Sequence, residues 1–312
     1  MKAAVYSRYG PPEVVHLEDV EKPTPKDHEV LVKVHAATVA AGDVRMRKPD
    51  PVAARLYNGL FRPRKVTVLG FELAGDVVAT GRHAKRFKEG DPVFAFTGFH
   101  FGAHAQYRCL PELGTVKKGL IAQKPSRMTY AQAAAVPVGG LTALAFLRKG
   151  HVQPGHAVLV YGASGSVGTY AVQLAKYFGA RVTGVCSSAN LDLVRSLGAD
   201  RVVDYKAEDF TASGDTYDLV FDAVGKTSAA RSRGSVKRGG VFLSVNGSAD
   251  VLAEDLDYLR GVIDEGKLTA VIDRCYPLEQ IAEAHRYVEA GHKKGNVVVT
   301  VEDTLAHTGG GS

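Results

Sequence analysis

The sequence of 312 residues contains no tryptophan, only three cysteines and no long hydrophobic run. Cys109, Cys186 and Cys275 are odd in number and widely spaced, which excludes a disulfide framework and a CxxC metal knuckle. We expect structural thiols. The longest nearly apolar stretch, residues 133–147, contains proline and glycine and is shorter than the roughly 20 residues of a membrane helix. No membrane span is therefore predicted.

Neither sign of charge dominates strongly, since 39 Lys and Arg against 33 Asp and Glu give a formal charge of +6. Without a long basic run or a basic motif interleaved with aromatics, nucleic-acid binding is not expected. Two short basic clusters, residues 45–48 and 62–65, are interpreted as solvated loop positions. A charge interrupts the first residues before a signal-peptide core could form, which predicts a cytoplasmic protein.

The composition is that of an ordinary folded protein of about two domains, with 45% hydrophobic and 23% charged residues. Residues 1–123 show short β-like runs broken by proline and glycine. Residues 124–266 alternate strand and helix patterns, which predicts a doubly wound parallel sheet. Residues 267–302 are too short for a domain, and we expect them to complete the first one. Residues 303–312 read as a flexible tail.

A glycine-rich turn opens the second domain and is the clearest motif. A buried strand at 156–161 precedes it, an amphipathic helix to residue 178 follows it, and a second strand is expected at 181–186. Gly165 would let the backbone approach a diphosphate, and Gly168 would allow close packing of helix and strand. We predict dinucleotide binding, with a purely structural glycine turn as the alternative. The predicted contacts in the turn are Gly162, Ala163, Ser164, Gly165, Ser166, Val167 and Gly168.

The end of the second strand bears on which nicotinamide cofactor binds. An Asp or Glu there would bind the ribose 2′-hydroxyl of NAD. The segment instead contains Ser187, Ser188 and Asn190, and the first carboxylate is Asp192. The absence of a carboxylate permits a 2′-phosphate, although the segment offers no cation. We therefore predict NADPH.

These motifs together resemble the medium-chain dehydrogenase/reductases, in particular the zinc-free quinone oxidoreductase and enoyl reductase type. The resemblance covers nearly the whole chain, with the motifs in the right order. It rests on residues 1–4, 9–14, 29–34, 42–43, 69–75, 90–93, 139–143, 162–168 and 222–225.

The resemblance implies a GroES-like, mainly β first domain and a Rossmann second domain in an α/β protein. It also implies that Thr142 lies near the nicotinamide ribose, that Val224 and Gly225 lie near the cofactor, and that Tyr205 lies near the adenosine phosphate. Asn296 would approach the cofactor from the returning strand. Alternatively, Thr142 caps a helix and Tyr205 is a packed aromatic.

Zinc-dependent relatives use a Cys in the loop that is occupied here by residues 39–42, and a His just before Glu72. Val39 and Phe71 fill those places, and neither can bind a metal, so no metal is predicted. Without a Lewis acid, reduction of a quinone or of the C=C bond of an α,β-unsaturated carbonyl is favoured over alcohol oxidation. We place Phe71, Phe96 and His100 at the substrate mouth. His104 could line it as well, although a His pair four residues apart in a glycine-containing loop is more often a surface or packing feature.

The proton donor is less well marked. Some relatives carry a Tyr after the Gly-Asp segment, and Tyr57 is the only Tyr in the corresponding loop here. Tyr57 and Asp43 are therefore the catalytic candidates. Ala40 stands where many relatives hold Asn or Thr, so solvent could supply the proton instead.

The segment after residue 245 is short, and the sixth Rossmann strand is expected to be missing. That strand commonly pairs across a dimer axis in the family, so its absence predicts a monomer. The alternative functions are a ketone or aldehyde reductase and a non-catalytic, crystallin-like NADPH-binding protein. A basic surface that binds RNA is a weaker third alternative.

Overall fold

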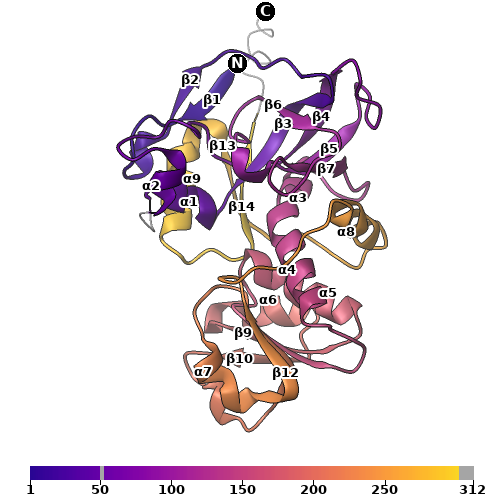
Figure 1. Cartoon of the computed structure of the whole chain (residues 1–312). Helices are drawn as coiled ribbons and strands as arrows, with labels where there is room; N and C mark the ends of the chain where they lie inside the picture. Colours follow the sequence, from indigo (N-terminus) through magenta and orange to yellow (C-terminus); the bar gives the residue numbers. More distant parts are fainter. Residues whose placement is uncertain (50–52, 302–312) are drawn as a thin grey trace, which may run out of the picture. The chain divides into compact units, whose positions relative to one another are not determined.

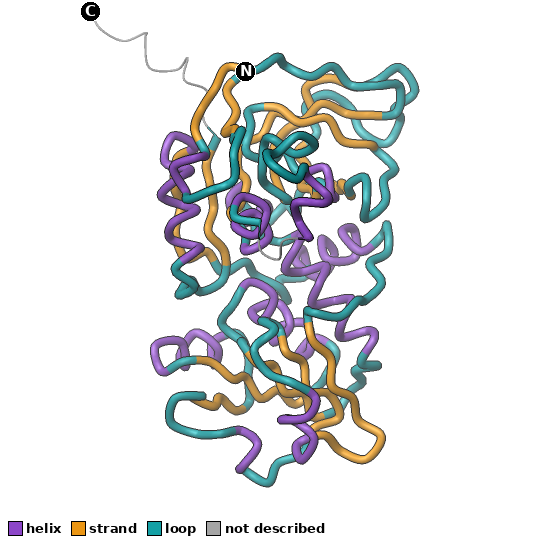
Figure 2. The backbone as a smooth tube through the Cα atoms, turned by 60° about the vertical axis from the view of Figure 1, so that its left-hand side comes forward, coloured by secondary structure: helices purple, strands orange, loops and turns teal. Residues whose placement is uncertain are grey.

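A computed structural model describes residues 1–49 and 53–301. The chain forms two compact units, one of Met1–Pro137 with the segment from Ile272 onward, and one of Val138–Val271. The first unit is built mainly from strands and loops, whereas strands and helices alternate in the second (Figure 2). No helix in the described ranges has the length and apolar character needed to cross a bilayer.

The first unit contains a seven-stranded sheet in the order β13-β14-β3-β4-β5-β7, with β6 paired to β3 (Figure 1). A separate antiparallel pair is formed by β1 and β2. Antiparallel pairing of β14 with β3 places Val297 opposite Val39, so the C-terminal segment does return to this unit. The strands are β1 (Lys2–Val5), β2 (His16–Asp19), β3 (Glu29–Val39), β4 (Glu72–Thr80), β5 (Pro92–Phe96), β6 (Tyr107–Pro111), β7 (Leu120–Gln123), β13 (Ile272–Pro277) and β14 (Asn296–Thr300).

Among the described residues of this unit, four α-helices accompany the sheet: α1 (Ala41–Arg47), α2 (Ala53–Asn58), α3 (Tyr130–Ala134) and α9 (Ile281–Glu289). The units divide after Pro137 and before Ile272, later than the boundaries near 123 and 266 that the sequence suggested. The reason is that α3 packs against β3 and β4, so it belongs with the first sheet. The predicted tail, residues 303–312, lies outside the described residues.

The second unit is a parallel sheet in the order β10-β9-β8-β11-β12. All of its residues are described, and its sheet has five strands, in agreement with the missing sixth. The strands are β8 (Ala157–Tyr161), β9 (Arg181–Cys186), β10 (Arg201–Asp204), β11 (Tyr217–Asp222) and β12 (Val236–Ser244). The helices are α4 (Pro137–Lys149), α5 (Ser166–Tyr177), α6 (Leu191–Ser196), α7 (Ala229–Ser232) and α8 (Asp255–Asp264).

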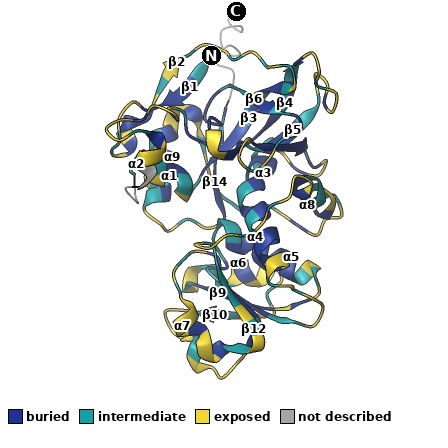
Figure 3. Ribbon diagram, viewed as in Figure 1, coloured by how far each residue is buried: buried dark blue, intermediate teal, exposed yellow. Residues whose placement is uncertain are grey.

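The interior of each unit is built on its sheet, whose central strands are dark blue in Figure 3. Val158, Leu159 and Val160 of β8 are fully buried, as expected for a parallel strand covered on both faces. Cys186 is also buried, whereas Cys275 is exposed, so the interpretation as buried structural thiols does not extend to Cys275. Strand β8 lies between β9 and β11, and the strand order reverses there: β9 and β10 follow on one side of β8, and β11 and β12 on the other. Open parallel sheets bind their ligands at such a switch point, beyond the carboxyl ends of the strands.

Candidate cofactor and substrate sites

The turn after β8 depends on a glycine with a left-handed backbone. Gly162 has a φ of +80°, and a Cβ there would lie 2.5 Å from Cγ1 of Val224. The amides of Gly162 and Ala163 both donate to the carbonyl of Val185 on β9, at 2.9 Å each. Because only glycine tolerates both the φ and the contact, this residue lets the chain turn from β8 into α5.

Helix α5 begins at this turn without a side-chain cap, since its N-cap is Gly165. A Cβ at Gly168 would lie 2.1 Å from the Gly162 carbonyl oxygen, so close packing of the helix on the turn requires that glycine. At Gly165 the nearest atoms would be 3.4 Å and 3.6 Å from a Cβ, so the chain itself leaves room there. An uncapped helix start with open space beside it fits a diphosphate. Ser164, Ser166 and Val167 are partly exposed around this space, whereas Ala163 is buried.

The end of β9 is tied to the glycine turn by Asn190. Its Nδ2 donates to the hydroxyl oxygens of Ser164 at 3.1 Å and Ser187 at 3.2 Å. Three polar side chains therefore meet where the adenosine ribose binds in this class of sheet.

A carboxylate that the sequence reasoning missed also reaches this edge. Asp204 ends β10, and its Oδ2 accepts a hydrogen bond from the Ser188 hydroxyl. Its Oδ1 accepts from the Lys206 amide at 3.0 Å, and these hydrogen bonds, led by that from Ser188, hold its pKa below the usual range. The neighbouring Tyr205 is half exposed. Because parallel pairing places Asp204 beside Cys186, only the register of the sheet reveals this charge.

The loop after β11 is organised by Asp222, a residue of the motif at 222–225 to which sequence reasoning assigned no role of its own. This residue is fully buried and accepts hydrogen bonds from the amides of Val224, Lys226 and Thr227, each at 3.2 Å. These bonds fix Val224 against Gly162. Gly225 has a φ of +69°, so the loop also needs this glycine. The sequence signal for this role was a single Asp at the end of a buried strand, followed by an Ala-Val-Gly segment.

The helix carrying Thr142 packs closely on the start of α5. A Cβ at Gly139 would lie 2.8 Å from the Tyr170 ring and 3.0 Å from the Ser166 carbonyl oxygen, so glycine permits the approach. Thr142 follows one helical turn later, inside α4 and partly exposed. Since Thr142 is inside the helix rather than at its start, it is not an N-cap.

In the first unit, Asp43 is a structural carboxylate. Its Oδ2 accepts from the Ala40 amide at 2.8 Å and its Oδ1 from the Gly70 amide at 2.7 Å. Burial raises the pKa of this carboxyl to about 7, against the lowering effect of these amides. Because Asp43 is fully buried with both oxygens engaged, it is placed to hold the start of α1 against residue 70 rather than to exchange a proton with a ligand.

Three aromatic rings gather beside this loop. The ring of Phe71 lies 4.0 Å from that of Phe101 and 6.3 Å from that of Phe96, measured between centroids. A Cβ at Gly42 would lie 2.5 Å from the Phe71 ring, so the glycine before Asp43 makes room for it. The structure thus brings together two predicted substrate residues, Phe71 and Phe96, both partly exposed.

Tyr57 lies on α2 and is 38% exposed. Its hydroxyl donates to the carbonyl oxygen of Phe99 at 2.6 Å, and the Lys65 ammonium lies 3.9 Å from the centroid of its ring. Tyr57 therefore joins α2 to the segment between Phe96 and Phe101. To act as a proton donor, the Tyr57 hydroxyl would have to break its hydrogen bond to the Phe99 carbonyl and donate to a substrate oxygen instead.

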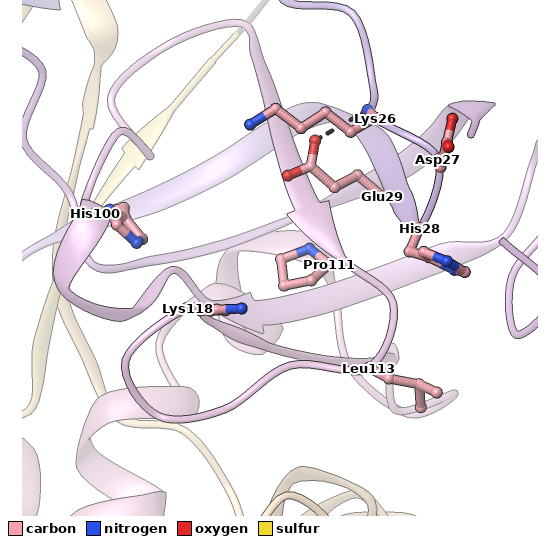
Figure 4. Close-up of a pocket in the computed structure, with 8 residues that line it drawn as sticks. All are labelled: Lys26, Asp27, His28, Glu29, His100, Pro111, Leu113 and Lys118. Atoms are coloured by element: carbon pink, nitrogen blue, oxygen red, sulfur yellow. Dashed lines mark hydrogen bonds between the residues drawn. The ribbon is translucent and has the colours of Figure 1, made fainter. Parts of the chain in front are cut away.

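His100 and His104 occupy different environments. His100 is exposed and lines a pocket of about 750 Å³ together with residues such as Lys26, Glu29 and Lys118 (Figure 4). Neither Phe71 nor Phe96 lines this pocket. His104 is fully buried, with Nε2 2.8 Å from the Thr38 carbonyl oxygen, so it is a packing residue and does not line the substrate mouth. The four-residue spacing of the two histidines does not indicate which of them is exposed and which is buried.

Asn296 is the first residue of β14 and is buried. The Lys293 ammonium lies near it, since it donates at 2.6 Å to the carbonyl oxygen of Gly295, the residue before Asn296. Burial lowers the pKa of Lys293, while the charge of Glu72 opposes that shift. Among residues 1–49 and 53–301, no three His, Cys, Asp or Glu side chains form a cluster of metal ligands.

Known proteins match this arrangement along nearly the whole chain. Residues 26–124 match the family described as "Alcohol dehydrogenase GroES-like domain", and residues 166–261 match "Zinc-binding dehydrogenase". The chain is 35% identical, over 96% of its length and 79% of the relative's, to "NADPH-dependent alkenal/one oxidoreductase, chloroplastic" of Arabidopsis thaliana.

Two solved structures share the fold. The quinone oxidoreductase from Coxiella burnetii is 29% identical with a TM-score of 0.82, over 97% of this chain and 99% of that one. A structure described as an NAD-dependent alcohol dehydrogenase is 30% identical with a TM-score of 0.84, over 97% of this chain and 100% of the other. The chain therefore belongs to the medium-chain dehydrogenase/reductase superfamily.

Proposed function

We propose that this protein is an NADPH-dependent oxidoreductase that reduces α,β-unsaturated carbonyls or quinones. The observation that carries the proposal is the turn at residues 162–168. Beside Gly165 in this turn is a space that no other atom of the protein fills. The relatives named for alkenal/one and quinone reduction support the substrate class.

The residues of the second unit fit the cofactor. The N-terminus of α5 would bind the diphosphate, and Ser187 and Tyr205 would contact the adenosine end. Asp222 positions the loop that carries Val224 and Gly225. When bound, NADPH supplies a hydride for transfer to an electrophilic carbon.

The residues of the first unit would receive the acceptor molecule. Phe71 and Phe96 offer an apolar surface suited to a conjugated, planar substrate. We propose that Tyr57 holds the proton on its hydroxyl oxygen and releases it to the substrate, with solvent as the alternative source. The contributions of Thr142, Asn296 and His100 to binding, and the cytoplasmic location, stay predictions.

The test combines a substrate panel with a substitution in the turn. We expect the protein to oxidise NADPH with an enone or a quinone and not with the saturated analogue of the enone. Turnover of the saturated ketone alone would indicate a carbonyl reductase, and NADPH binding with no turnover of any substrate would indicate a non-catalytic protein.

A Gly165→Val substitution fills the open space at the turn and should weaken NADPH binding by about two orders of magnitude, as expected when a side chain occupies a diphosphate site. Calorimetric titration would measure the change. Gly261→Val in α8 is the matched control, because nothing lies within 4 Å of a Cβ there. Equal affinities of the two variants would remove the turn from the proposed site.

A further inference from the structure

Three large apolar side chains project into solvent from α2 and the loop after it. Leu56, Leu60 and Phe61, hereafter the apolar tip, are 82%, 53% and 88% exposed. Helix α2 lies at the surface of the first unit (Figure 3). Scattered apolar residues are normal on protein surfaces, but three within six positions form a local patch that needs a reason.

The chain around the apolar tip is held in place at its base. Asn58 is 1% exposed, and its Oδ1 accepts from the amides of Lys65 at 3.2 Å and Val66 at 2.7 Å. Its Nδ2 donates to the Tyr6 hydroxyl at 2.7 Å. These bonds close the loop onto the core, so the apolar tip points outward from an anchored loop.

The path of the loop adds two further restraints. The Tyr9 hydroxyl donates to the Gly59 carbonyl oxygen at 2.7 Å, and the Arg64 amide donates to the Asn58 carbonyl oxygen at 2.7 Å. Pro63 is buried while Phe61 is exposed. A loop that buries its proline and exposes its phenylalanine does not use the phenylalanine for its own packing.

Positive charge surrounds the apolar tip. Arg62 and Arg64 are exposed, and within the described part of the chain neither forms an ion pair. The sequence from residue 53 to residue 71 contains four basic residues and no acidic one. The cluster at 62–65, interpreted from sequence as solvated, therefore flanks exposed apolar side chains.

We propose that the apolar tip is an interfacial anchor for anionic phospholipid surfaces. Phe61, Leu60 and Leu56 enter the boundary between headgroups and acyl chains, while Arg62 and Arg64 contact lipid phosphates. Exposed aromatic and leucine side chains beside arginine are the combination that binds such an interface without crossing the bilayer.

The charge of the patch argues against a second copy of the chain as its occupant. In a two-fold symmetric contact through the apolar tip, Arg62 and Arg64 of one copy would face the same residues of the other. Like charges opposed in this way cost binding energy. An anionic lipid surface supplies the opposite charge and an apolar layer together.

Vesicle sedimentation tests the proposal directly. The full chain should pellet with vesicles of phosphatidylcholine mixed with phosphatidylglycerol, and bind phosphatidylcholine alone at least about tenfold more weakly. Phe61→Ser should reduce the partition onto the mixed vesicles by about tenfold or more, because a phenyl ring leaves the apolar layer. Arg62→Glu should have a similar effect that added salt reproduces in the unchanged protein.

Matched controls separate this effect from general changes in surface character. Leu113→Ser removes a leucine that is 77% exposed elsewhere on the same unit, and Arg127→Glu reverses an exposed charge away from the apolar tip. Both should leave vesicle binding unchanged. All four variants should retain thermal stability and turnover of a water-soluble enone.

Three outcomes would overturn the proposal. The unchanged protein could fail to bind the mixed vesicles, or Phe61→Ser could bind as well as the unchanged protein. Alternatively, sedimentation velocity could show a dimer that Phe61→Ser dissociates, which would assign the patch to a second copy. Because vesicle binding is measured without cofactor, failure here leaves the proposed enzymatic function untouched.

Discussion

At the scale of single residues, we predict that the charge of Asp204 weakens the preference for NADPH over NADH. Its carboxylate accepts a hydrogen bond from Ser188, at the edge of the sheet where a 2′-phosphate would bind. Two unit charges about 4 Å apart interact by about 1 kcal/mol in water-like surroundings. We expect Asp204→Asn to lower the KM for NADPH about fivefold and to change that for NADH less than twofold.

The asparagine oxygen can still accept from the Lys206 amide, and its Nδ2 can donate to the Ser188 hydroxyl oxygen, so the change removes the charge and reverses one hydrogen bond. Asp192→Asn is the control, because Asp192 is an exposed carboxylate in the following helix, α6. Initial rates with both cofactors would measure the change. A KM for NADPH that is the same in Asp204→Asn and the unchanged enzyme would show that the charge does not face the cofactor.

Tyr57 carries the second prediction at this scale. If its hydroxyl donates the proton, Tyr57→Phe lowers kcat on an enone at least tenfold, about 1.4 kcal/mol, with a smaller change in KM. The measurement is steady-state kinetics with an enone and with a quinone. Because the same hydroxyl donates to Phe99, a purely structural role would instead raise KM and leave kcat unchanged. That second pattern would assign the proton to solvent.

At the scale of elements, the sheet of the second unit ends at β12, and its edge is poorly suited to pairing. The register with β11 shifts between Tyr217 and Leu219, where residues 237–240 of β12 leave the regular ladder. That segment reads Lys-Arg-Gly-Gly. Bulges and charges are common ways in which proteins protect an edge strand.

We therefore expect sedimentation equilibrium at micromolar concentration to give the mass of one chain, 33.2 kDa. The dimer of the family commonly uses a sixth strand, and this unit has five. A stable dimer that is lost on mutating the apolar tip would involve a different surface. A stable dimer that is insensitive to that mutation would contradict the prediction about this edge.

Local patterns were sufficient to predict the strand, turn and helix at residues 156–178, because a buried strand, a glycine turn and an amphipathic helix follow one another directly in the sequence. The start of β12 was predicted at residue 241 and lies at Val236, since the shifted segment hides the alternation. Contacts between residues distant in sequence could not be predicted. They include those of Asp43 with Gly70, Tyr57 with Phe99, and Asp204 with Ser188. Each depends on strand register or loop packing, so the candidate site was predicted in its glycine turn and only partly elsewhere.

At the scale of the whole molecule, buried ionisable groups set the response to acid. His104 and His285 are fully buried, with ring centroids 5.8 Å apart, and neither nitrogen of His285 has a partner among the described residues. Burial lowers the pKa of His104 to about 4 and that of His285 well below its usual value, with the charge of Arg47 adding to the latter shift. Asp43 acts in the opposite direction, because burial raises its pKa to about 7.

The sign of the pH dependence follows from proton uptake. As the pH falls from about 6.5 toward 4, each of these histidines takes up a proton in the unfolded chain and little in the folded one, so stability falls. Asp43 holds a proton in the folded chain over the same window and is ionised in the unfolded chain, so its contribution to stability rises. Because the two histidines lower the stability on acidification and the one carboxyl raises it, these three groups together lower the free energy of unfolding as the pH falls.

A His285→Leu substitution isolates one of these groups. Between pH 6.5 and 4.5 the unchanged protein should lose about 1.4 kcal/mol of unfolding free energy per pH unit more than the variant does, which corresponds to one proton. Urea titrations followed by circular dichroism at several pH values would measure both slopes. His292→Leu, at an exposed position, should keep the slope of the unchanged protein. Parallel slopes for the unchanged protein and His285→Leu would mean that His285 is protonated in the folded chain, and therefore that water or a charged partner reaches it.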